Sequence, residues 1–221
     1  MTNKRELNKQ LTTEHILKTA TYLFNLNGYD QTTTKEIAKS AAMSPVTLYK
    51  YFPNKHAIFK AIVIRDIDNE LTHAEANIAQ ADFTDAKNLS ALLTEHHALT
   101  TNYSDQMYFD VMRDFAGEFG DNEVSDFYRE RTDHFWRLFI QRLRTAKLIK
   151  PTMSTEALLL YIDVWLSYFS NPESLKKTAN IFVEIINQII ELFFFGMLDP
   201  NDKTRTTMKK SILKLSVTDI I

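Results

Sequence analysis

The sequence predicts an all-α protein made of a small N-terminal helical unit and a larger C-terminal helical bundle. The 221 residues include only four glycines and five prolines, whereas turn-rich β architectures need many more of both. Apolar residues recur at helical spacing through most of the long segments. The hydrophobic share of 44% and the charged share of 24% are those of a globular protein with a sizeable core.

The first predicted helix covers residues 12–27. Its apolar positions run from Ile16 to Phe24 with the i, i+4, i+7, i+8 spacing of an amphipathic helix. Thr12 or Thr13 is expected to be the N-cap residue, because a threonine hydroxyl accepts a hydrogen bond from a free N–H of the first turn. Gly28 follows where a helix commonly ends.

A second, short helix is predicted to begin at Thr34 and to end near Ala41. Thr33 and Glu36 have the T-x-x-E spacing of a capping box, in which each side chain accepts a hydrogen bond from the other residue's backbone N–H. A connection of only a few residues leads from this helix to the next one.

The third predicted helix covers residues 45–52 and ends before Pro53. Ser44 can cap it, and Pro45 takes the first helical position, where its missing N–H costs nothing. At about 100° per residue, Leu48 and Phe52 fall on one side of this helix and are expected to be buried. The opposite side carries Val46, Thr47 and Lys50, with Tyr49 and Tyr51 at its flanks.

The charges divide unevenly along the chain, although the formal net charge is only −2. The first 60 residues carry nine Lys or Arg against four Asp or Glu, whereas the rest carries 17 against 24. A basic head on an acidic body favours a polyanionic partner at one end, although a charge run is often only a solvated face. The chain contains no cysteine, which excludes disulfides and thiol catalysis and fits a reducing cytoplasm.

Two short helices joined by a brief turn have the layout of a helix-turn-helix. The methyl groups of Val46 and Thr47 can contact a thymine methyl group, and Lys50 can donate to guanine O6 or N7. Tyrosine hydroxyls and the N–H groups of the next helix, beside Lys55, can bind phosphates. These features indicate DNA recognition, while the spacing alone also fits an amphipathic helix that merely packs one face.

The stretch EHILKTATYLFNLNGYDQTTTKEIAKSAAMSPVTLYKYFPNKHAIFKAI, residues 14–62, resembles the DNA-binding domain of the tetracycline-repressor (TetR/AcrR) family of transcriptional regulators. The markers are the first amphipathic helix, the NGYDQTT junction, KEIAKSA and the S-x-x-T-L-Y-x-Y-F-x-N-K run. Ala42 departs from the pattern, since many relatives carry glycine there; a positive φ at this position would strain alanine. The resemblance implies DNA contacts by Thr34, Lys35, Ser44, Pro45, Val46, Thr47, Tyr49, Lys50, Tyr51 and Lys55.

Beyond the third helix, the sequence predicts a long helix from Lys55 that leads out of the N-terminal unit. Further helices are expected at about residues 86–102, 105–116, 122–148, 154–170 and 174–197. The predicted domains are residues 10–70 for DNA binding, with the helix-turn-helix at about 33–52, residues 71–200 for ligand binding and dimerisation, and residues 201–221 as a C-terminal connector and tail.

The resemblance implies a homodimer that binds a palindromic operator, because the family commonly pairs its last two long helices with those of a second subunit. Residues 154–170 and 174–197 are too apolar all round for solvent-facing helices, so we expect the interface there, although core helices of a monomer would look similar. The resemblance further implies repression released by a small molecule. Phe109, Met112 and Trp136 are candidate residues of an apolar ligand pocket.

Two other classes of protein fit parts of the sequence. A helical-bundle enzyme with a di-metal site needs two Glu-x-x-His pairs, and only Glu70 and His73 have this spacing. A protein-interaction bundle whose basic head binds an acidic partner is the other alternative. No cofactor and no catalytic residue are predicted. Acidic residues interrupt the most apolar segments, so we expect no membrane span and a cytoplasmic protein.

Overall fold

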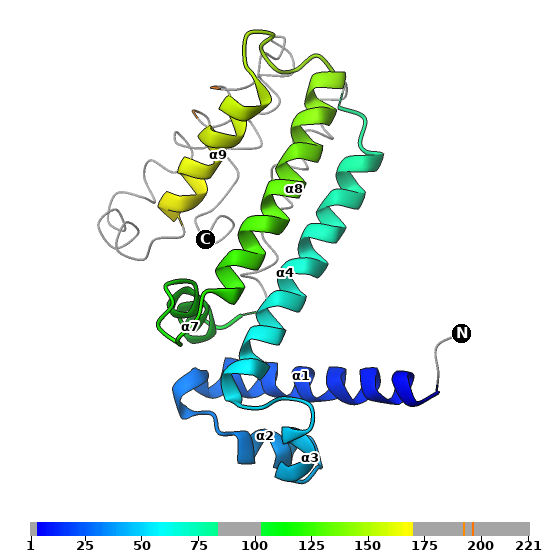
Figure 1. Cartoon of the computed structure of the whole chain (residues 1–221), viewed down its shortest axis with the longest axis vertical. Helices are drawn as coiled ribbons and strands as arrows, with labels where there is room; N and C mark the ends of the chain where they lie inside the picture. The colour runs from blue at the N-terminus through cyan, green and yellow to red at the C-terminus, as the bar shows by residue number, and fades with distance from the viewer. Residues whose placement is uncertain (1–3, 84–102, 170–191, 193–195, 197–221) are drawn as a thin grey trace. The chain divides into compact units, whose positions relative to one another are not determined.

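The structure, a computed structural model, describes residues 4–83, 103–169, 192 and 196 of the chain (Figure 1). The described part is built from helices, as predicted from the sequence. In chain order they are α1 (Lys4–Gln31), α2 (Thr34–Ser40), α3 (Pro45–Tyr49), α4 (Lys55–Gln80), α7 (Asp105–Phe115), α8 (Glu123–Thr145) and α9 (Thr155–Phe169).

The chain divides into two compact units. The first unit contains residues 1–67 and 102–127, and the second contains residues 68–101 and 128–221. The domain boundary expected from the sequence, between residues 70 and 71, stays a prediction. Residues 102–127, which the sequence assigned to the C-terminal domain, belong to the first unit. The DNA-binding part of the prediction therefore lies in a unit that is discontinuous in sequence.

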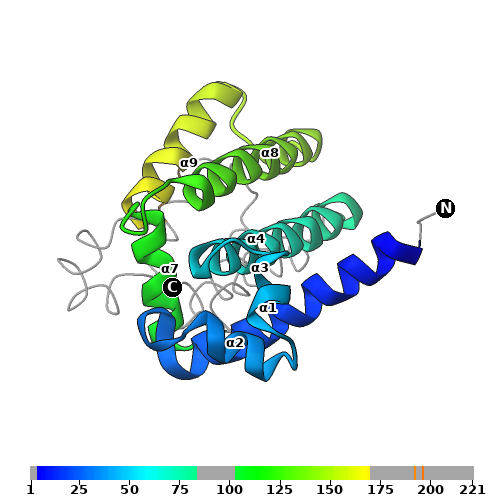
Figure 2. The same ribbon diagram turned by 60° about the horizontal axis from the view of Figure 1, so that its bottom comes forward.

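The core of the first unit forms around the middle of α1, which runs alongside α2, α3 and the start of α4 (Figures 1 and 2). Ile16 and Phe24 from α1, Ile37 from α2 and Phe59 from α4 are all fully buried. The rings of Phe24 and Phe59 meet edge to face at 5.3 Å between centroids. The apolar stripe of the first predicted helix thus forms the contact surface for the short helices.

The helix α1 begins eight residues before the predicted start at residue 12, so the prediction of Thr12 or Thr13 as N-cap is wrong. The Thr12 hydroxyl donates instead to the carbonyl oxygen of Asn8 at 2.8 Å, one turn back along the same helix. Residues 4–11 are rich in Lys, Arg, Glu, Gln and Leu, which have high helix propensity and extend the helix without an apolar stripe. Gly28, with φ 76° and ψ 169°, interrupts the helical backbone near the expected place.

The turn between α2 and α3 closes with an alanine in the left-handed region. The N–H of Ala42 donates to the carbonyl of Lys39 at 3.1 Å, and the N–H of Met43 donates to that of Ala38 at 2.9 Å. This pair of hydrogen bonds is a Schellman motif, whose C′ residue is usually glycine. Ala42 has φ 52°, so the positive φ considered from the sequence is present and strains this residue.

The helix α3 ends at Tyr49, three residues before the predicted end at residue 52. The N–H groups of Tyr51 and Phe52 both donate to the carbonyl of Leu48, which tightens the chain into a turn. Pro53 disfavours helical backbone in the residue before it, which explains why α3 stops early. Tyr51 therefore lies in a turn and not on the helix.

The helix α7 packs against the C-terminal end of α1 within the first unit (Figures 1 and 2). Phe119, which follows α7, stacks on the Tyr29 ring at 4.2 Å between centroids and meets Phe59 edge to face. Gly28 lies at the same contact, where an added Cβ would come within 2.7 Å of the Gln106 side chain. A residue larger than glycine would therefore disturb both the backbone and the helix contact.

In the second unit, the end of α4 lies beside α8 (Figure 1). Arg131 of α8 joins them, because its guanidinium donates to Asp68 at 2.8 Å and to Glu75 at 2.9 Å. The observed bounds of α4, α7, α8 and α9 agree with the predicted segments to within a few residues. The predicted helix at 86–102 and the tail at 201–221 lie outside the described residues, as does most of the segment 174–197.

Candidate nucleic-acid interface

The start of α3 is fixed by its N-cap residue. Ser44 Oγ accepts a hydrogen bond from the N–H of Thr47 at 3.0 Å, and the two hydroxyls lie 2.9 Å apart. Pro45 occupies the first helical position, as predicted. Leu48 is fully buried and Phe52 is 9% exposed, which anchors the segment in the core of the first unit. Local capping and two apolar side chains thus set the orientation of α3.

The outward face of α3 combines apolar, hydroxyl and cationic groups. Val46 is 69% exposed and Tyr49 is 50% exposed, while Lys50 is exposed and Thr47 is partly buried. Base edges in the major groove of DNA offer thymine methyl groups and hydrogen-bond acceptors, which match this set of groups. The short rigid helix presents them together on one side.

The start of α2 joins the same surface. The hydroxyls of Thr34 and Tyr49 lie within hydrogen-bond distance at 3.0 Å, and Lys35 is exposed beside them. The predicted capping box is present, since Thr33 N–H donates to Glu36 at 2.8 Å and Glu36 N–H donates to the Thr33 hydroxyl at 3.2 Å. The hydrogen bonds from Thr33 hold the pKa of the Glu36 carboxyl below its usual range.

Lys55, at the start of α4, is engaged within the protein. Its ammonium donates to the carbonyl of Tyr29 at 2.6 Å and lies 4.1 Å from the centre of the Tyr29 ring. Burial lowers the pKa of Lys55. This contact ties the start of α4 to the end of α1, so Lys55 has a structural role in addition to the phosphate contact predicted from the sequence.

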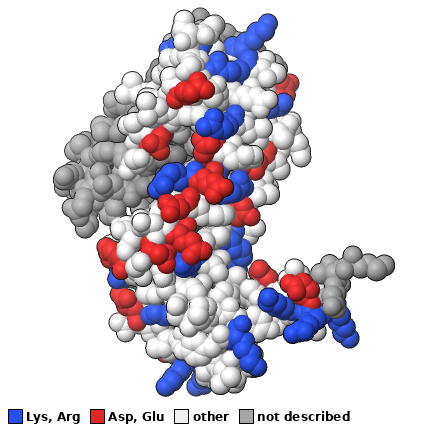
Figure 3. Space-filling model, in the orientation of Figure 1, with Lys and Arg blue, Asp and Glu red and all other residues white. Residues whose placement is uncertain are grey.

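Basic side chains mark this part of the first unit. On the face seen in Figure 3, Lys and Arg side chains project from the N-terminal part of α1 and from the end formed by α2 and α3. The exposed cations on these three helices include Lys35, Lys39 and Lys50. A surface with this excess of positive charge attracts the phosphate backbone of a nucleic acid.

A buried polar contact between α1 and α7 was not predicted from the sequence. The N–H of Tyr29 donates to Asp110 Oδ2 at 2.7 Å. The other oxygen of this fully buried carboxylate accepts from Arg113 at 3.0 Å, and the same guanidinium donates to Asp30 at 2.9 Å. A buried carboxylate is costly unless it is paired, so these hydrogen bonds fix where α7 docks. The signal in the sequence is an acid on the same face of α7 as Met107.

A second buried acid of α7 faces the start of α4. Asp114 is 1% exposed, and its Oδ1 lies 2.8 Å from His56 Nε2. Burial raises the pKa of Asp114 even though the hydrogen bond to His56 acts in the opposite direction. The nearby Lys60 donates to Asp121 at 2.8 Å and also to Glu123. Polar contacts therefore hold residues 110–123 to the helices of the predicted DNA-binding region.

The three residues predicted to bind a ligand fall in different units. Phe109 and Met112 lie on α7 in the first unit, where Phe109 is 50% exposed. Trp136 lies on α8 in the second unit and packs edge to face on Phe135 and Phe139. The prediction that these residues share a pocket thus stays a prediction.

Over the described ranges, no group of three or more His, Asp or Glu side chains is placed to hold a metal ion. His73 is exposed on α4, one turn after Glu70. None of the helices within those same ranges is long and apolar enough to cross a membrane.

The capped α2 and α3, the turn between them and the outward face of α3 define a helix-turn-helix protein. Residues 16–62 match the family model described as bacterial regulatory proteins of the tetR family. The N-terminal part of the chain is therefore similar to this family, in agreement with the resemblance seen in the sequence. The chain is also 33% identical over 98 residues to the HTH-type transcriptional regulator UidR of Escherichia coli (strain K12), a region that covers 44% of this chain and 50% of UidR. The chain thus spans about half the length of the curated relatives it matches.

Solved structures share the fold over most of the chain. A TetR-family transcriptional regulator from Marinobacter aquaeolei VT8 is 22% identical with a TM-score of 0.58, covering 90% of this chain and 98% of that one. SmeT, the repressor of the Stenotrophomonas maltophilia multidrug efflux pump SmeDEF, is 16% identical with a TM-score of 0.61, covering 89% and 94%. FadR from Bacillus subtilis, in complex with stearoyl-CoA, is 17% identical with a TM-score of 0.54, covering 83% and 98%.

Proposed function

We propose that the protein is a cytoplasmic, dimeric, sequence-specific DNA-binding regulator that represses transcription until a small molecule releases it. The observation that carries this proposal is the outward face of α3. Val46, Thr47 and Tyr49 lie on a helix that Leu48 anchors and Ser44 caps, and Lys50 is the C-cap residue of that helix. An exposed valine and tyrosine beside a lysine suit the edges of base pairs, which offer both apolar and polar partners.

The residues at the edge of this face are proposed to bind phosphates. Lys35 lies in the first turn of α2, and the Thr34 and Tyr49 hydroxyls lie together at 3.0 Å. Contacts of this kind position a protein on the duplex without reading its sequence. Ser44, Pro45, Tyr51 and Lys55 complete the proposed contact surface, although the Lys55 ammonium also donates to the carbonyls of Tyr29 and Asp30.

Dimerisation is proposed because a helix-turn-helix protein reads a palindromic operator with two recognition helices about 34 to 36 Å apart. Leu160 and Val164 of α9 are 66% and 60% exposed, one helical turn apart, within the predicted interface segment 154–170. Exposed apolar side chains on one helix face favour a protein contact. Segment 174–197 is proposed as the second half of the interface because its sequence is too apolar for a solvent-facing helix.

Release by a ligand is proposed from the relatives. One structural neighbour is in complex with stearoyl-CoA, and another is the repressor of a multidrug efflux pump. A ligand that separates the two recognition helices would weaken operator binding, and operator binding would weaken ligand binding by the same factor. Phe109, Met112 and Trp136 remain the proposed ligand contacts.

Selection of duplexes from random DNA by the purified protein tests the proposal. We expect a two-fold symmetric consensus whose binding weakens steeply as salt rises. Equal binding to all duplexes would reject the regulator function and favour a protein-interaction bundle with a basic head. Bound iron or manganese at a stoichiometric amount would instead favour the enzyme alternative at Glu70 and His73.

Two lysine variants separate base reading from phosphate binding. Lys50→Ala should relax the base preference at one position of each half-site and cost about 1 to 3 kcal/mol on the selected operator. Lys35→Ala should weaken all duplexes alike and lower the salt slope by about 1. Lys35 is a cleaner test of phosphate binding than Lys55, because loss of Lys55 would also break the contact to Tyr29. The opposite pattern would mean that the two lysines have exchanged roles.

A further inference from the structure

A groove in the first unit lies between the N-terminal end of α1 and the residues that follow α3. Its volume is about 940 Å³, and its lining includes Lys4, Arg5 and Lys9 from α1 together with Lys50 and Tyr51. Glu6 is the acidic residue of the lining. Four cationic side chains and one carboxylate thus line a groove that adjoins the recognition helix.

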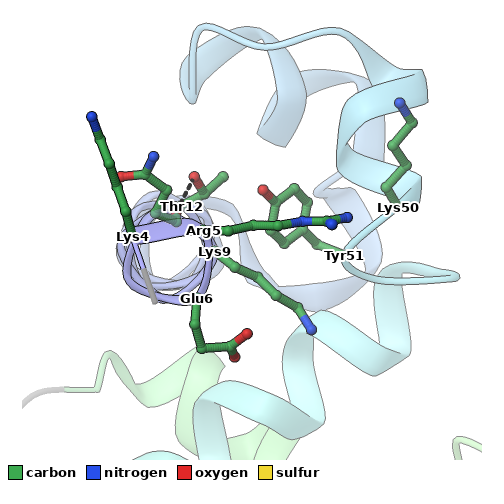
Figure 4. Close-up of a pocket in the computed structure, with 8 residues that line it drawn as sticks. Lys4, Arg5, Glu6, Lys9, Thr12, Lys50 and Tyr51 are labelled. Atoms are coloured by element: carbon green, nitrogen blue, oxygen red, sulfur yellow. Dashed lines mark hydrogen bonds between the residues drawn. The ribbon is translucent and has the colours of Figure 1, made fainter. Parts of the chain in front are cut away.

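The basic side chains from α1 reach the groove from successive turns of one helix. Figure 4 looks along α1 and shows Arg5 and Lys9 extending toward the side where Tyr51 and Lys50 lie, whereas Glu6 points away from them. Arg5 and Lys9 are about 6 Å apart along the helix axis, since each residue rises 1.5 Å. Successive phosphates of one DNA strand are about 3.4 Å apart along the helix axis of the duplex. Two cations about 6 Å apart can therefore both contact phosphates of the same strand.

The first two turns of α1 contribute no buried side chain to the core of the unit. Residues 4–11 are all exposed, including Leu7 at 49% and Leu11 at 61%. Burial of apolar surface is the main force that holds helices in a fold, so this extension is not explained by the core. The extension places Lys4, Arg5 and Lys9 at the rim of the groove.

We propose that this groove binds the phosphate backbone of DNA just outside the base pairs read by α3. The inference rests on the proposed function, since it requires a duplex on α3. Lys50 belongs to both surfaces, because it stands on the outward side at the end of α3 and also lines the groove. A DNA strand that runs from α3 past Lys50 and Tyr51 would enter the groove. Its phosphates would there contact Arg5 and Lys9. This contact does not depend on the base sequence of the DNA, because the groove binds only phosphates.

The matched variants are Lys9→Ala and Lys18→Ala. Both lysines are exposed on α1, and their separation of nine positions places them on opposite sides of the helix. Lys9→Ala should lower the salt slope of operator binding by about 0.9, and Arg5→Ala combined with Lys9→Ala should lower it by about 1.8. Lys18→Ala should leave the slope unchanged. Thermal unfolding and helix content measured on each variant detect any loss of structure.

Duplex length provides a second readout that a folding defect would not imitate. Wild-type protein should bind an operator with several flanking base pairs more tightly than a duplex that ends at the outer edge of the half-sites. The Arg5→Ala and Lys9→Ala double variant should bind both duplexes alike, and Arg5→Lys with Lys9→Arg should restore the difference. The base preference should be the same in all of these proteins.

The inference is overturned if the double variant keeps the wild-type slope and the wild-type dependence on flanking length, or if Lys18→Ala has the same effect as Lys9→Ala. A wild-type protein with no base preference in the random selection would instead reject the proposed function, whatever the variants do. The two failures are therefore distinguishable.

Discussion

At the scale of single residues, Ala42 is a strained position that a single substitution can relieve. Its φ of 52° costs a residue with a Cβ about 1 to 2 kcal/mol relative to right-handed backbone, and glycine avoids this cost. Ala42 is exposed, so its methyl group contributes little to packing. We expect Ala42→Gly to raise the free energy of unfolding by about 1 kcal/mol, measured by chemical denaturation.

Ser40→Gly is the control for this substitution, because Ser40 is exposed in the last turn of α2 with helical backbone. Glycine should lower stability there by about 0.5 kcal/mol. A gain at both positions would show that the φ of Ala42 is not the cause. Equal operator affinity of Ala42→Gly and wild type would further show that alanine does not tilt α3.

At the scale of elements, the contact between α1 and α7 depends on Asp110. Asp110→Ala removes the acceptor of the Tyr29 N–H and leaves Arg113 with fewer partners, so the free energy of unfolding should fall by about 3 kcal/mol. Hydrogen exchange at the Tyr29 amide should speed up in the same variant. The exposed Asp105 in the first turn of α7 gives the control, with an expected loss of a few tenths of a kcal/mol for Asp105→Ala. Similar losses from the two variants would contradict this role of Asp110.

The short helices could be predicted from the sequence because their ends are fixed by nearby residues. Thr33 and Glu36 contact each other across three positions, and Ser44 contacts Thr47 in the same way. The start of α1 could not be found by looking for an apolar stripe, because residues 4–11 form a helix without one. The pairing of Tyr29 with Asp110 joins residues 81 positions apart, and no local pattern specifies such a contact.

Some features of the candidate DNA-binding surface could be predicted from the sequence, and others could not. The exposed and buried sides of α3 follow from helix periodicity, so the outward residues were predictable. The engagement of Lys55 by Tyr29 and the groove beside Lys50 arise from segments that meet only in the folded chain. Such features need the structure.

At the scale of the whole molecule, the proposed dimer can be tested at α9. Leu160→Glu places a charge in the centre of the proposed interface and should convert the dimer to a monomer at micromolar concentrations, as measured by sedimentation velocity. Asp163→Asn, on an adjacent side of the same helix, should leave the dimer intact. A Leu160→Glu protein that remains dimeric would place the interface elsewhere.

Operator binding should fall together with dimerisation. Leu160→Glu should lose affinity for a palindromic duplex far more than for a single half-site, because only the palindrome uses two recognition helices. Equal losses on both duplexes would indicate damage to the fold of the protomer.

The discontinuous first unit has a consequence for how the chain is made. Residues 4–67 leave the ribosome well before residues 110–119, which provide the acceptor for the Tyr29 N–H and the ring that covers Tyr29. Tyr29 and Phe59 of the nascent N-terminal helices therefore lack their contacts with Phe119 while residues 68–101 are synthesised. Completion of the unit that carries the proposed DNA-binding surface is thereby tied to the synthesis of part of the other unit.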